Sequence, residues 1–280
     1  MIASAPSGTP GTPFARRTLL HLAPHPDDEV MGGPAIMLAL QASGHRIINA
    51  ACGLGRPEDH QRREAEVRES CGRAGFEVLI PSPPVAISSN DDLQAAQVEL
   101  AELVSTLIRR ESVDIVFSPS PHDRHPGHEV VGRAALDALS PLEDSSPAWW
   151  MWGLWADLPF PTLIAYFGTE RLRQILDALD AHTAELERND YRRLVKARAE
   201  TNAALGPERV FGFGAPGLRG DLAELATEAI FKDGDWRMGT PRQLDPQDPL
   251  VQPTHKSLSA WLMEPSLTQR FGPPGSRAAI

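Results

Sequence analysis

Two patterns of hydrophobic and polar positions alternate along the first half of the chain. Short apolar runs, typical of buried strands, occupy residues 18–24, 46–52, 76–80 and 113–120. Stretches with helical spacing follow them at residues 32–44, 57–75, 91–111 and 128–139. Strands that alternate with helices predict βαβ units. We therefore expect an α/β fold of the Rossmann-like, doubly wound type, with a mostly parallel sheet and helices on both faces.

The pattern becomes less regular beyond Leu142. Apolar segments around residues 149–155 and 162–167 predict two further strands, and residues 169–205 have the character of one long helical stretch. These segments give no sign of an internal repeat.

The length of the chain predicts one domain. It has 280 residues, 41% of them hydrophobic, which is enough for one large α/β unit. We expect this domain to span residues 17–263. A flexible tail at residues 1–16 and a loosely ordered tail at residues 264–280 flank it, because both are rich in Ser, Pro and Gly.

Charge excludes several classes of partner. The formal net charge is −10, the sequence pI is about 5.4, and Lys and Arg residues do not cluster. A protein that grips phosphate backbones or anionic membrane surfaces needs the opposite balance, so we expect no nucleic acid partner. The sequence specifies no oligomeric state.

The cysteines and the apolar segments favour a cytoplasmic protein. Cys52 and Cys71 lack the spacing of a disulfide framework or a thiolate metal site. The most apolar segment, residues 148–167, is interrupted by Asp157 and two prolines, so we expect no transmembrane span. Residues 1–17 lack the apolar core of a secretory signal.

Polar side chains gather where two of the predicted strands end. The first apolar run leads directly into HPDDE at residues 25–29, and the fourth leads into PHDRHPGH at residues 121–128. In a doubly wound sheet the active site forms outside the carboxyl ends of the strands, so we expect the two clusters to meet there.

The residue types in these clusters suit a metal. A catalytic zinc ion takes three nitrogen or oxygen ligands and leaves one position for water, which two histidines and one aspartate satisfy. His125 and His128 are three residues apart at a helix start, so their rings share one side. The alternative is that these side chains only cap helices. Because both clusters end strands of one sheet, we favour metal chemistry.

With these motifs the chain resembles the LmbE-like or PIG-L-like N-acetylglucosamine de-N-acetylases, over about its first 140 residues. Residues 25–29 match the family's HPDDE signature and residues 123–128 match its DxHxxH segment. Arg63 and Glu66 resemble its RxxE. Residues 181–185, AHTAE, are a loose echo of its later AHxSQ segment, with Ala and Glu in place of Ser and Gln.

The resemblance implies a role for each matched residue. His25, Asp28 and His128 correspond to ligands of Zn²⁺, and Asp27 corresponds to the general base. His125 corresponds to the residue that stabilises the oxyanion, which we expect it to do in its protonated form.

Gly127 is a departure from the family pattern. The family often has Asp immediately before the last metal-ligand histidine. We expect the surroundings of the ligands to differ here, because such a side chain would support them.

Other polar residues give weaker signals. Arg63 is expected to contact substrate hydroxyls or an acidic group at the mouth of the site. Asp92, with Asp91, is a candidate for binding sugar hydroxyls, although capping of the following helix explains it equally well. Glu29 and His182 are expected to be structural.

Four of the six tryptophans crowd one short segment, at positions 149, 150, 152 and 155. Aromatic side chains at strand spacing are normal core material. The alternative is an aromatic wall that faces a bulky glycoside or a lipid chain attached to it.

The predicted function is zinc-dependent hydrolysis of the N-acetyl amide of an N-acetylglucosaminyl conjugate, a small molecule, in glycopeptide-antibiotic or other secondary-metabolite biosynthesis. A deacetylase of a thiol-cofactor precursor, such as that of mycothiol, is the first alternative. A noncatalytic Rossmann-like binding protein is the second. The first turn has only Gly32 and Gly33 and lacks GxGxxG, so dinucleotide binding has little support.

Overall fold

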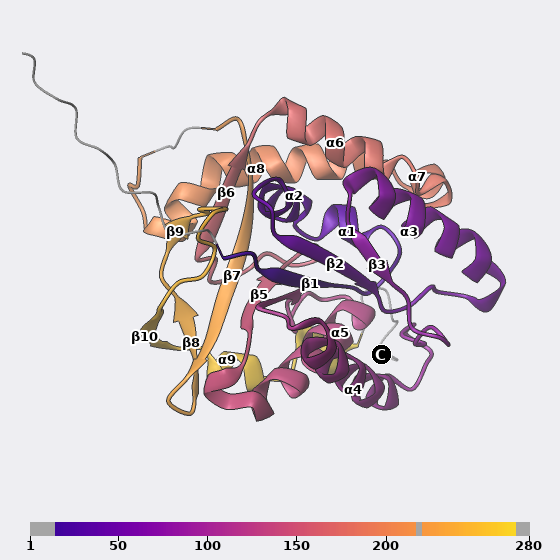
Figure 1. Cartoon of the computed structure of the whole chain (residues 1–280), viewed down its shortest axis with the longest axis horizontal. Helices are drawn as coiled ribbons and strands as arrows, with labels where there is room; N and C mark the ends of the chain where they lie inside the picture. Colours follow the sequence, from indigo (N-terminus) through magenta and orange to yellow (C-terminus); the bar gives the residue numbers. More distant parts are fainter. Residues whose placement is uncertain (1–14, 217–219, 273–280) are drawn as a thin grey trace, which may run out of the picture.

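The parallel half of the sheet forms as the pattern of apolar runs predicts. The computed structural model describes residues 15–216 and 220–272 (Figure 1). Five parallel strands lie in the order β3-β2-β1-β4-β5. Their bounds are β1 (Thr18–Ala23), β2 (Arg46–Ala51), β3 (Glu77–Leu79), β4 (Ile115–Pro119) and β5 (Ala148–Trp152). The strand order reverses between β1 and β4, which is where an open α/β sheet offers its binding crevice.

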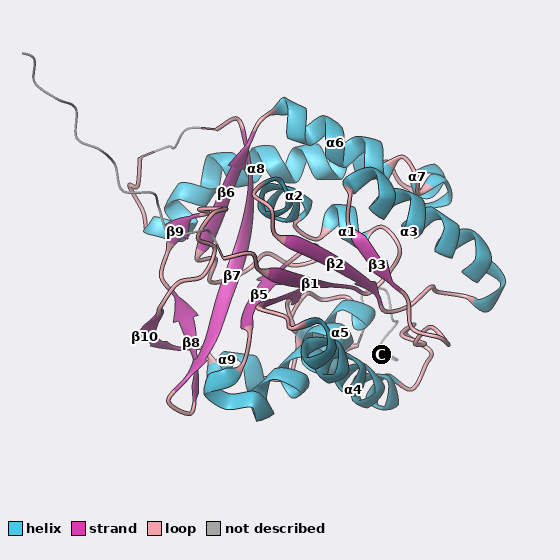
Figure 2. Ribbon diagram, viewed as in Figure 1, coloured by secondary structure: helices cyan, strands magenta, loops and turns pink. Residues whose placement is uncertain are grey.

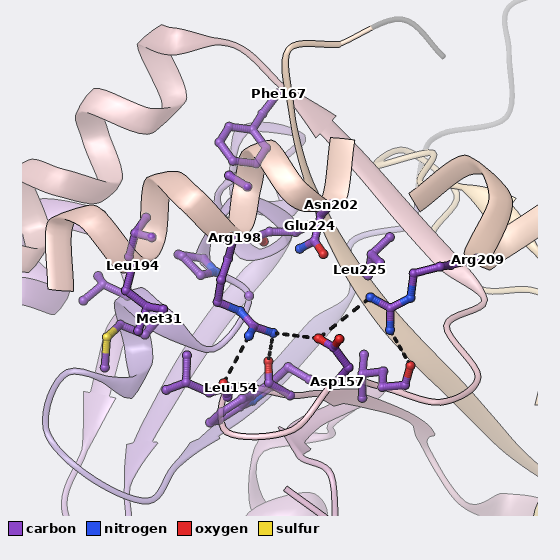
Figure 3. A pocket seen from close by; sticks show the side chains of 18 residues that line it. Met31, Leu154, Asp157, Phe167, Leu194, Arg198, Asn202, Arg209, Glu224 and Leu225 are labelled. Carbon is purple, nitrogen blue, oxygen red and sulfur yellow. Dashed lines mark hydrogen bonds and ion pairs between the residues drawn. The ribbon is translucent and has the colours of Figure 1, made fainter. Parts of the chain in front are cut away.

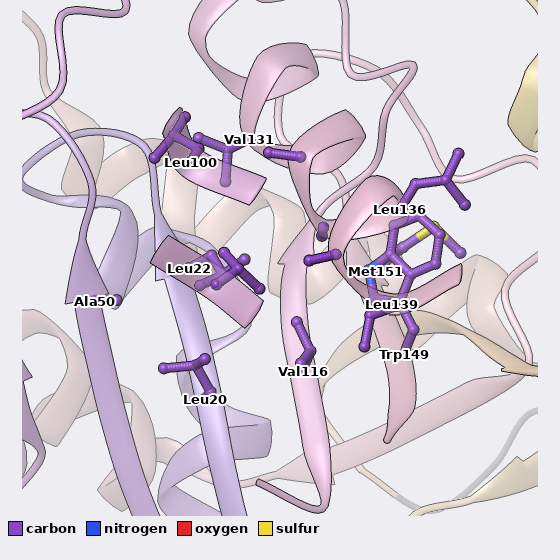
Figure 4. Close-up of a cluster of buried hydrophobic side chains, with 14 of the residues drawn as sticks. Leu20, Leu22, Ala50, Leu100, Val116, Val131, Leu136, Leu139, Trp149 and Met151 are labelled. Carbon is purple, nitrogen blue, oxygen red and sulfur yellow. The ribbon is translucent and has the colours of Figure 1, made fainter. Parts of the chain in front are cut away.

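Helices cover both faces of this sheet (Figure 2). Leu20 and Leu22 of β1 point to one face, where they pack with α4 (Leu93–Glu111) and α5 (Pro126–Leu139), as Figure 4 shows. Leu19 points to the other face. The helices on that face are α2 (Pro34–Ala42), α3 (His60–Ala74) and α6 (Thr169–Leu179). The predicted doubly wound α/β class is therefore confirmed.

The C-terminal half extends the sheet further, and its strands from β7 onward are not predicted by the sequence pattern. The long strand β7 (Leu222–Lys232) pairs antiparallel with β5 and with β6 (Leu163–Phe167). The smaller strands are β8 (Asp235–Gly239), β9 (Arg242–Gln243) and β10 (Pro253–Ser257). The sheet is thus parallel from β3 to β5, and β7 pairs antiparallel with each of its neighbours, whereas β6 and β9 pair in parallel.

Two glutamates, the half-buried Glu224 and the buried Glu228, weaken the apolar pattern of strand β7. Glu224 accepts hydrogen bonds of 2.9 Å from the backbone nitrogens of Ala35 and Ile36, at the start of α2. Glu228 forms an ion pair with Arg242 at 2.6 Å. A buried strand with two carboxylates carries a weak apolar signal, although both side chains have partners.

One long helical stretch was expected at residues 169–205. The structure shows three helices there instead. They are α6, α7 (Thr183–Arg188) and α8 (Tyr191–Phe211). The breaks fall at residues 180–182 and 189–190. Asp and Asn in these breaks favour caps and turns over helix interiors. The strands expected around residues 149–155 and 162–167 are present as β5 and β6.

Three of the four clustered tryptophans belong to the core. Trp149, Trp150 and Trp152 are at most 2% exposed, and they point alternately to the two faces of β5. Trp155 lies beyond the strand and is 52% exposed. The segment is therefore core for three residues, and only Trp155 is available to a ligand.

Short helices complete the described chain. They are α1 (Asp28–Met31), η1 (Pro57–Asp59), η2 (Ser140–Ser145), α9 (Ser259–Met263) and α10 (Leu267–Phe271). Of the two expected tails, residues 1–14 and 273–280 lie outside the described residues. Residues 264–272 are described and include α10, where the buried Ser266 donates a 2.6 Å hydrogen bond to Glu129. Within the described chain, every helix is too short or too polar to cross a bilayer.

Close packing of α5 against the end of β4 fixes the segment that carries His125 and His128. A Cβ added at Gly132 would lie 2.7 Å from the carbonyl oxygen of Pro119 and 2.8 Å from the nitrogen of Pro121. Both atoms belong to the backbone, so the clash could be removed only by a shift of the loop itself. Glycine at this helix position therefore lets the helix approach the sheet.

We predict that Gly132→Ala lowers the free energy of unfolding by about 1–3 kcal/mol, because the added methyl overpacks this contact. Gly72→Ala in α3 is the matched control, since a Cβ there has nothing within 4 Å. It should raise stability by up to about 1 kcal/mol through the better helix propensity of Ala. Urea denaturation of both variants measures the difference. Equal stability of the two would contradict the proposed packing.

Candidate metal and catalytic site

The HPDDE cluster forms the tight turn after β1 and the first residues of α1. Asp27 adopts a backbone φ of 113°, a value that L-residues rarely take. Its backbone nitrogen donates a 3.0 Å hydrogen bond to the carboxylate of Glu29. The backbone nitrogen of His25 donates to Asp28 Oδ2 at 2.8 Å. The turn thus points neighbouring carboxylates in different directions.

The PHDRHPGH cluster follows β4, the strand beside β1, and the two clusters meet as expected. Asp28 Oδ2 lies 3.2 Å from His25 Nδ1 and 3.4 Å from His128 Nε2. Ligands at 2.0–2.1 Å from a tetrahedral zinc ion are separated by about 3.4 Å. The spacing of these three atoms therefore fits one metal ion.

His125 adds a third imidazole beside this set. Nitrogens of His25, His125 and His128 lie within 4.8 Å of one another, so a three-histidine site is the other possible ligand set. That spacing is looser than a tetrahedral edge, whereas the two distances to Asp28 match it. The set of His25, Asp28 and His128 is accordingly the better fit. His125 then lies beside the metal position.

Asp123 orients His128. Asp123 Oδ2 lies 2.8 Å from His128 Nδ1, so the ring presents Nε2 to Asp28. A carboxylate behind a metal-ligating histidine is a common support, because it fixes the ring and its tautomer. Asp123 belongs to the DxHxxH motif, but the motif alone gave it no role.

The two neighbouring aspartates of the turn have pKa values shifted in opposite directions. Burial raises the pKa of Asp28, but the nearby His128 and His25 outweigh this effect and hold the pKa below its usual value. For Asp27, burial and the charges of Asp28 and Glu29 act together and raise the pKa well above its usual value. Asp28 is thus an anion suited to a cation, and Asp27 has a high affinity for a proton.

The protonated form expected for His125 is wrong. Burial, followed by the neighbouring His25 and His128, lowers the pKa of His125 to about 3. The ring is therefore neutral near pH 7. Its Nδ1 atom is buried and has no hydrogen-bond partner among the described residues. Gly127, two residues after His125, has no side chain that could pair with His125 Nδ1.

A Cβ added at Gly127 would lie 2.8 Å from the ring of His25.

A cavity of about 110 Å³ opens at these residues. It is lined by residues of both clusters, of α1, α3, α7 and α8, and of the loop after β5: His25, Asp27, Asp28, Met31, Arg63, His125, His128, Leu154, Trp155, Glu185, Arg188 and Tyr191. A wider groove continues outward from it and shares Arg63, Trp155 and Glu185. The cavity therefore connects the candidate metal position to solvent.

The two weaker substrate-binding candidates have different positions. Arg63 lines the cavity and pairs with Glu185 of α7, which itself pairs with Arg188. Asp92 does not line it. Its carboxylate accepts hydrogen bonds from the backbone nitrogens of Gln94 and Ala95, at 3.1 and 3.0 Å, so it caps α4. The capping alternative is the one that the structure supports for Asp92.

Glu29 and His182 form a buried pair that the sequence alone does not predict. Their side chains are fully buried, and His182 Nε2 lies 2.5 Å from Glu29 Oε1. Burial lowers the pKa of His182, but Glu29 outweighs this and holds it above its usual value. The only signal for His182 was the loose AHxSQ echo. The pair connects the break between α6 and α7 to the turn that holds Asp27.

A protein-family model matches the N-terminal part of the chain. Residues 20–139 match the model of the PIG-L family, GlcNAc-PI de-N-acetylase, so the resemblance is confirmed there. No curated protein matches the chain.

Several solved structures share the fold. A zinc-inhibited form of teicoplanin deacetylase Orf2 has a TM-score of 0.58 and 15% identity, covering 77% of this chain and 99% of that one. N,N'-diacetylchitobiose deacetylase from Pyrococcus horikoshii has a TM-score of 0.54 and 18% identity, with 76% and 83% covered. GalB, the 4-carboxy-2-hydroxymuconate hydratase from Pseudomonas putida, has a TM-score of 0.52 and 16% identity, with 76% and 95% covered. At these identities the likeness shows the fold alone, which is that of the LmbE-like deacetylases.

We predict that His182→Ala lowers the free energy of unfolding by about 3–5 kcal/mol, because it leaves Glu29 buried without its counter-charge. His182→Gln should lose less, since an amide can still donate to the carboxylate. His255→Ala is the control. This histidine is exposed, and its loss should change stability by no more than about 0.5 kcal/mol. Equal loss from His182→Ala and His255→Ala would show that the pair is unimportant.

Proposed function

We propose that this chain, whose residues 20–139 match the PIG-L family, is a zinc-dependent hydrolase that removes the N-acetyl group from an N-acetylglucosaminyl conjugate. The observation that carries the proposal is the position of Asp28 Oδ2, 3.2 Å from His25 and 3.4 Å from His128, in a cavity that Asp27 also lines. The family match supports deacetylation, and the donor set supports the metal.

The chemistry of the donors suits zinc in particular. Two imidazole nitrogens and one carboxylate oxygen, with a further position open to the cavity, are typical of catalytic zinc sites. A bound zinc ion would lower the pKa of a water molecule to about 7 and polarise the amide carbonyl. One of the similar structures is described as a zinc-inhibited form, which is consistent with zinc binding in this fold.

Asp27 serves as the proton acceptor in this proposal. It lines the cavity next to the candidate ligands, and burial with the charges of Asp28 and Glu29 raises its pKa, so its ionised form has a high affinity for a proton. A carboxylate of raised pKa accepts a proton from the attacking water and then returns it to the departing amine. The products are acetate and a free amino sugar.

His125 serves as a hydrogen-bond donor. Its ring lies beside those of His25 and His128, with centroids 4.9 and 4.8 Å away, and it is neutral. A neutral imidazole still carries one N–H, which can stabilise the oxygen of the tetrahedral intermediate. The proposal therefore keeps the role of His125 and changes its charge.

Two kinds of group attached to the sugar are compatible with the proposal. The similar structures include a teicoplanin deacetylase, which favours a glycopeptide-antibiotic or related biosynthetic pathway. A precursor of a thiol cofactor such as mycothiol is the alternative. A hydratase with the same fold shows why the site has to be tested directly.

We expect the zinc-loaded protein to release a free amine from at least one conjugate in a panel. The panel links N-acetylglucosamine to inositol, to a glycopeptide aglycone, to a simple alkyl group and to a second sugar. Asp27→Asn should retain its zinc but lose roughly 10²- to 10⁴-fold in turnover, because the proton acceptor is removed. A protein that is metal-free, or that binds nucleotides instead, would support the noncatalytic alternative. Normal turnover by Asp27→Asn would exclude Asp27 as the base.

Asp123→Asn tests the support behind His128. The new side chain keeps an oxygen for the loop but presents an amide N–H₂ to His128 Nδ1, so we predict about 10- to 100-fold weaker zinc binding. Competition with a chelator measures this affinity. Asp92→Ala is the control, because Asp92 caps α4 outside the cavity; it should retain both zinc affinity and KM. A rise in KM for Asp92→Ala would instead restore Asp92 as a sugar-binding residue.

A further inference from the structure

Trp155 has an unusual position among the tryptophans of this chain. Its neighbours Trp149, Trp150 and Trp152 are at most 2% exposed, whereas Trp155 is 52% exposed. The indole lines both the catalytic cavity and the groove outside it. A large apolar side chain left open at the junction of two cavities is typical of a ligand contact.

The backbone around Trp155 is fixed from inside the protein. Asp123 Oδ1 accepts hydrogen bonds from the nitrogens of Leu154, Trp155 and Ala156, at 2.8, 3.1 and 3.0 Å. The other oxygen of the same carboxylate holds His128. The position of the indole is therefore tied to the position of a candidate metal ligand.

Two arginines of α8 also hold this loop, as Figure 3 shows. Arg198 donates to the carbonyl oxygens of Gly153 and Leu154, at 2.8 and 3.1 Å. Arg209 donates to that of Leu158 at 2.6 Å. Because Asp123 and both arginines hold the backbone of the loop, the exposure of Trp155 reflects a defined geometry.

The indole stacks on the ring of His125, with centroids 5.4 Å apart and planes 25° from parallel. One wall of the cavity is therefore flat and aromatic. Arg63, Glu185 and Arg188, which also line the cavity, are polar. A pyranose ring has the matching chemistry, with C–H groups on its faces and hydroxyl groups around its edge.

We propose that Trp155 is a specificity residue, which packs against the apolar face of the amino sugar and makes the enzyme prefer a pyranose over an open-chain acetamide. This inference rests on the proposed deacetylase function. It assigns to Trp155 the binding of the ring that carries the amide. It assigns no part in the chemical step, which remains with Asp27, His125 and the metal.

The test compares Trp155→Ala with wild type on two substrates, an alkyl glycoside of N-acetylglucosamine and N-(2-hydroxyethyl)acetamide. We expect Trp155→Ala to lower kcat/KM for the glycoside by roughly 10- to 100-fold, mainly through KM, because apolar contact is lost. For the open-chain amide kcat/KM should change by less than about twofold. Trp155→Phe should fall between wild type and Trp155→Ala.

Phe213→Ala is the matched control, because Phe213 is a fully exposed aromatic residue that lines neither the cavity nor the groove. It should behave as wild type. Equal losses by Trp155→Ala on both substrates would mean that the indole only supports His125, and an unchanged KM for the glycoside would also overturn the proposal.

A binding measurement separates this inference from the proposed function. Titration calorimetry of the glycoside into zinc-loaded Asp27→Asn, with and without Trp155→Ala, measures the contact without turnover. We expect Kd to rise roughly 10-fold or more when the indole is removed. If wild type hydrolyses neither substrate, the deacetylase function fails. If wild type hydrolyses the glycoside and Trp155→Ala binds it equally well, only the role of Trp155 fails.

Discussion

The arrangement of the site depends on one buried carboxylate, Asp123. One of its oxygens fixes the ring of His128, and the other accepts three backbone N–H groups from the loop after β5. A buried carboxylate is stable only when its lone pairs are satisfied, and here both oxygens have partners. The same residue therefore links the candidate metal ligand to the loop that presents Trp155. The connection crosses from β4 to β5, two strands that are adjacent in the sheet.

The surrounding charges show how the fold holds several acids in a small volume. Asp28 is stabilised as an anion by His25 and His128, and Glu29 by His182, whereas burial gives Asp27 a raised pKa. Each of the two anions thus has an imidazole within hydrogen-bonding distance. The remaining carboxylate, without such a partner, is the one suited to exchange a proton. The division of roles among three consecutive acids therefore follows from their separate neighbours.

The fold explains where the site lies, but it does not by itself specify the reaction. The polar clusters follow β1 and β4, the pair of strands at which the sheet order reverses. Deacetylases and a hydratase share this architecture at 15–18% identity. The identity of the residues at the strand ends and the family match over residues 20–139 are what favour amide hydrolysis. The second half of the chain adds the antiparallel strands and the helices that supply Glu185, Arg188 and His182.

The sequence alone determined the order of the main strands and helices up to β6, and the two polar clusters whose side chains meet, because hydropathy period and strand-end position are local signals. Only the tertiary structure separated Trp155 from the three buried tryptophans, assigned Asp92 to the cap of α4, and showed that His125 is neutral. It also paired Glu29 with His182, which is 153 residues away in the chain. These four results depend on which distant segments pack together and on how completely they exclude water. The spacing of residues along the chain specifies neither the packing nor the exclusion of water.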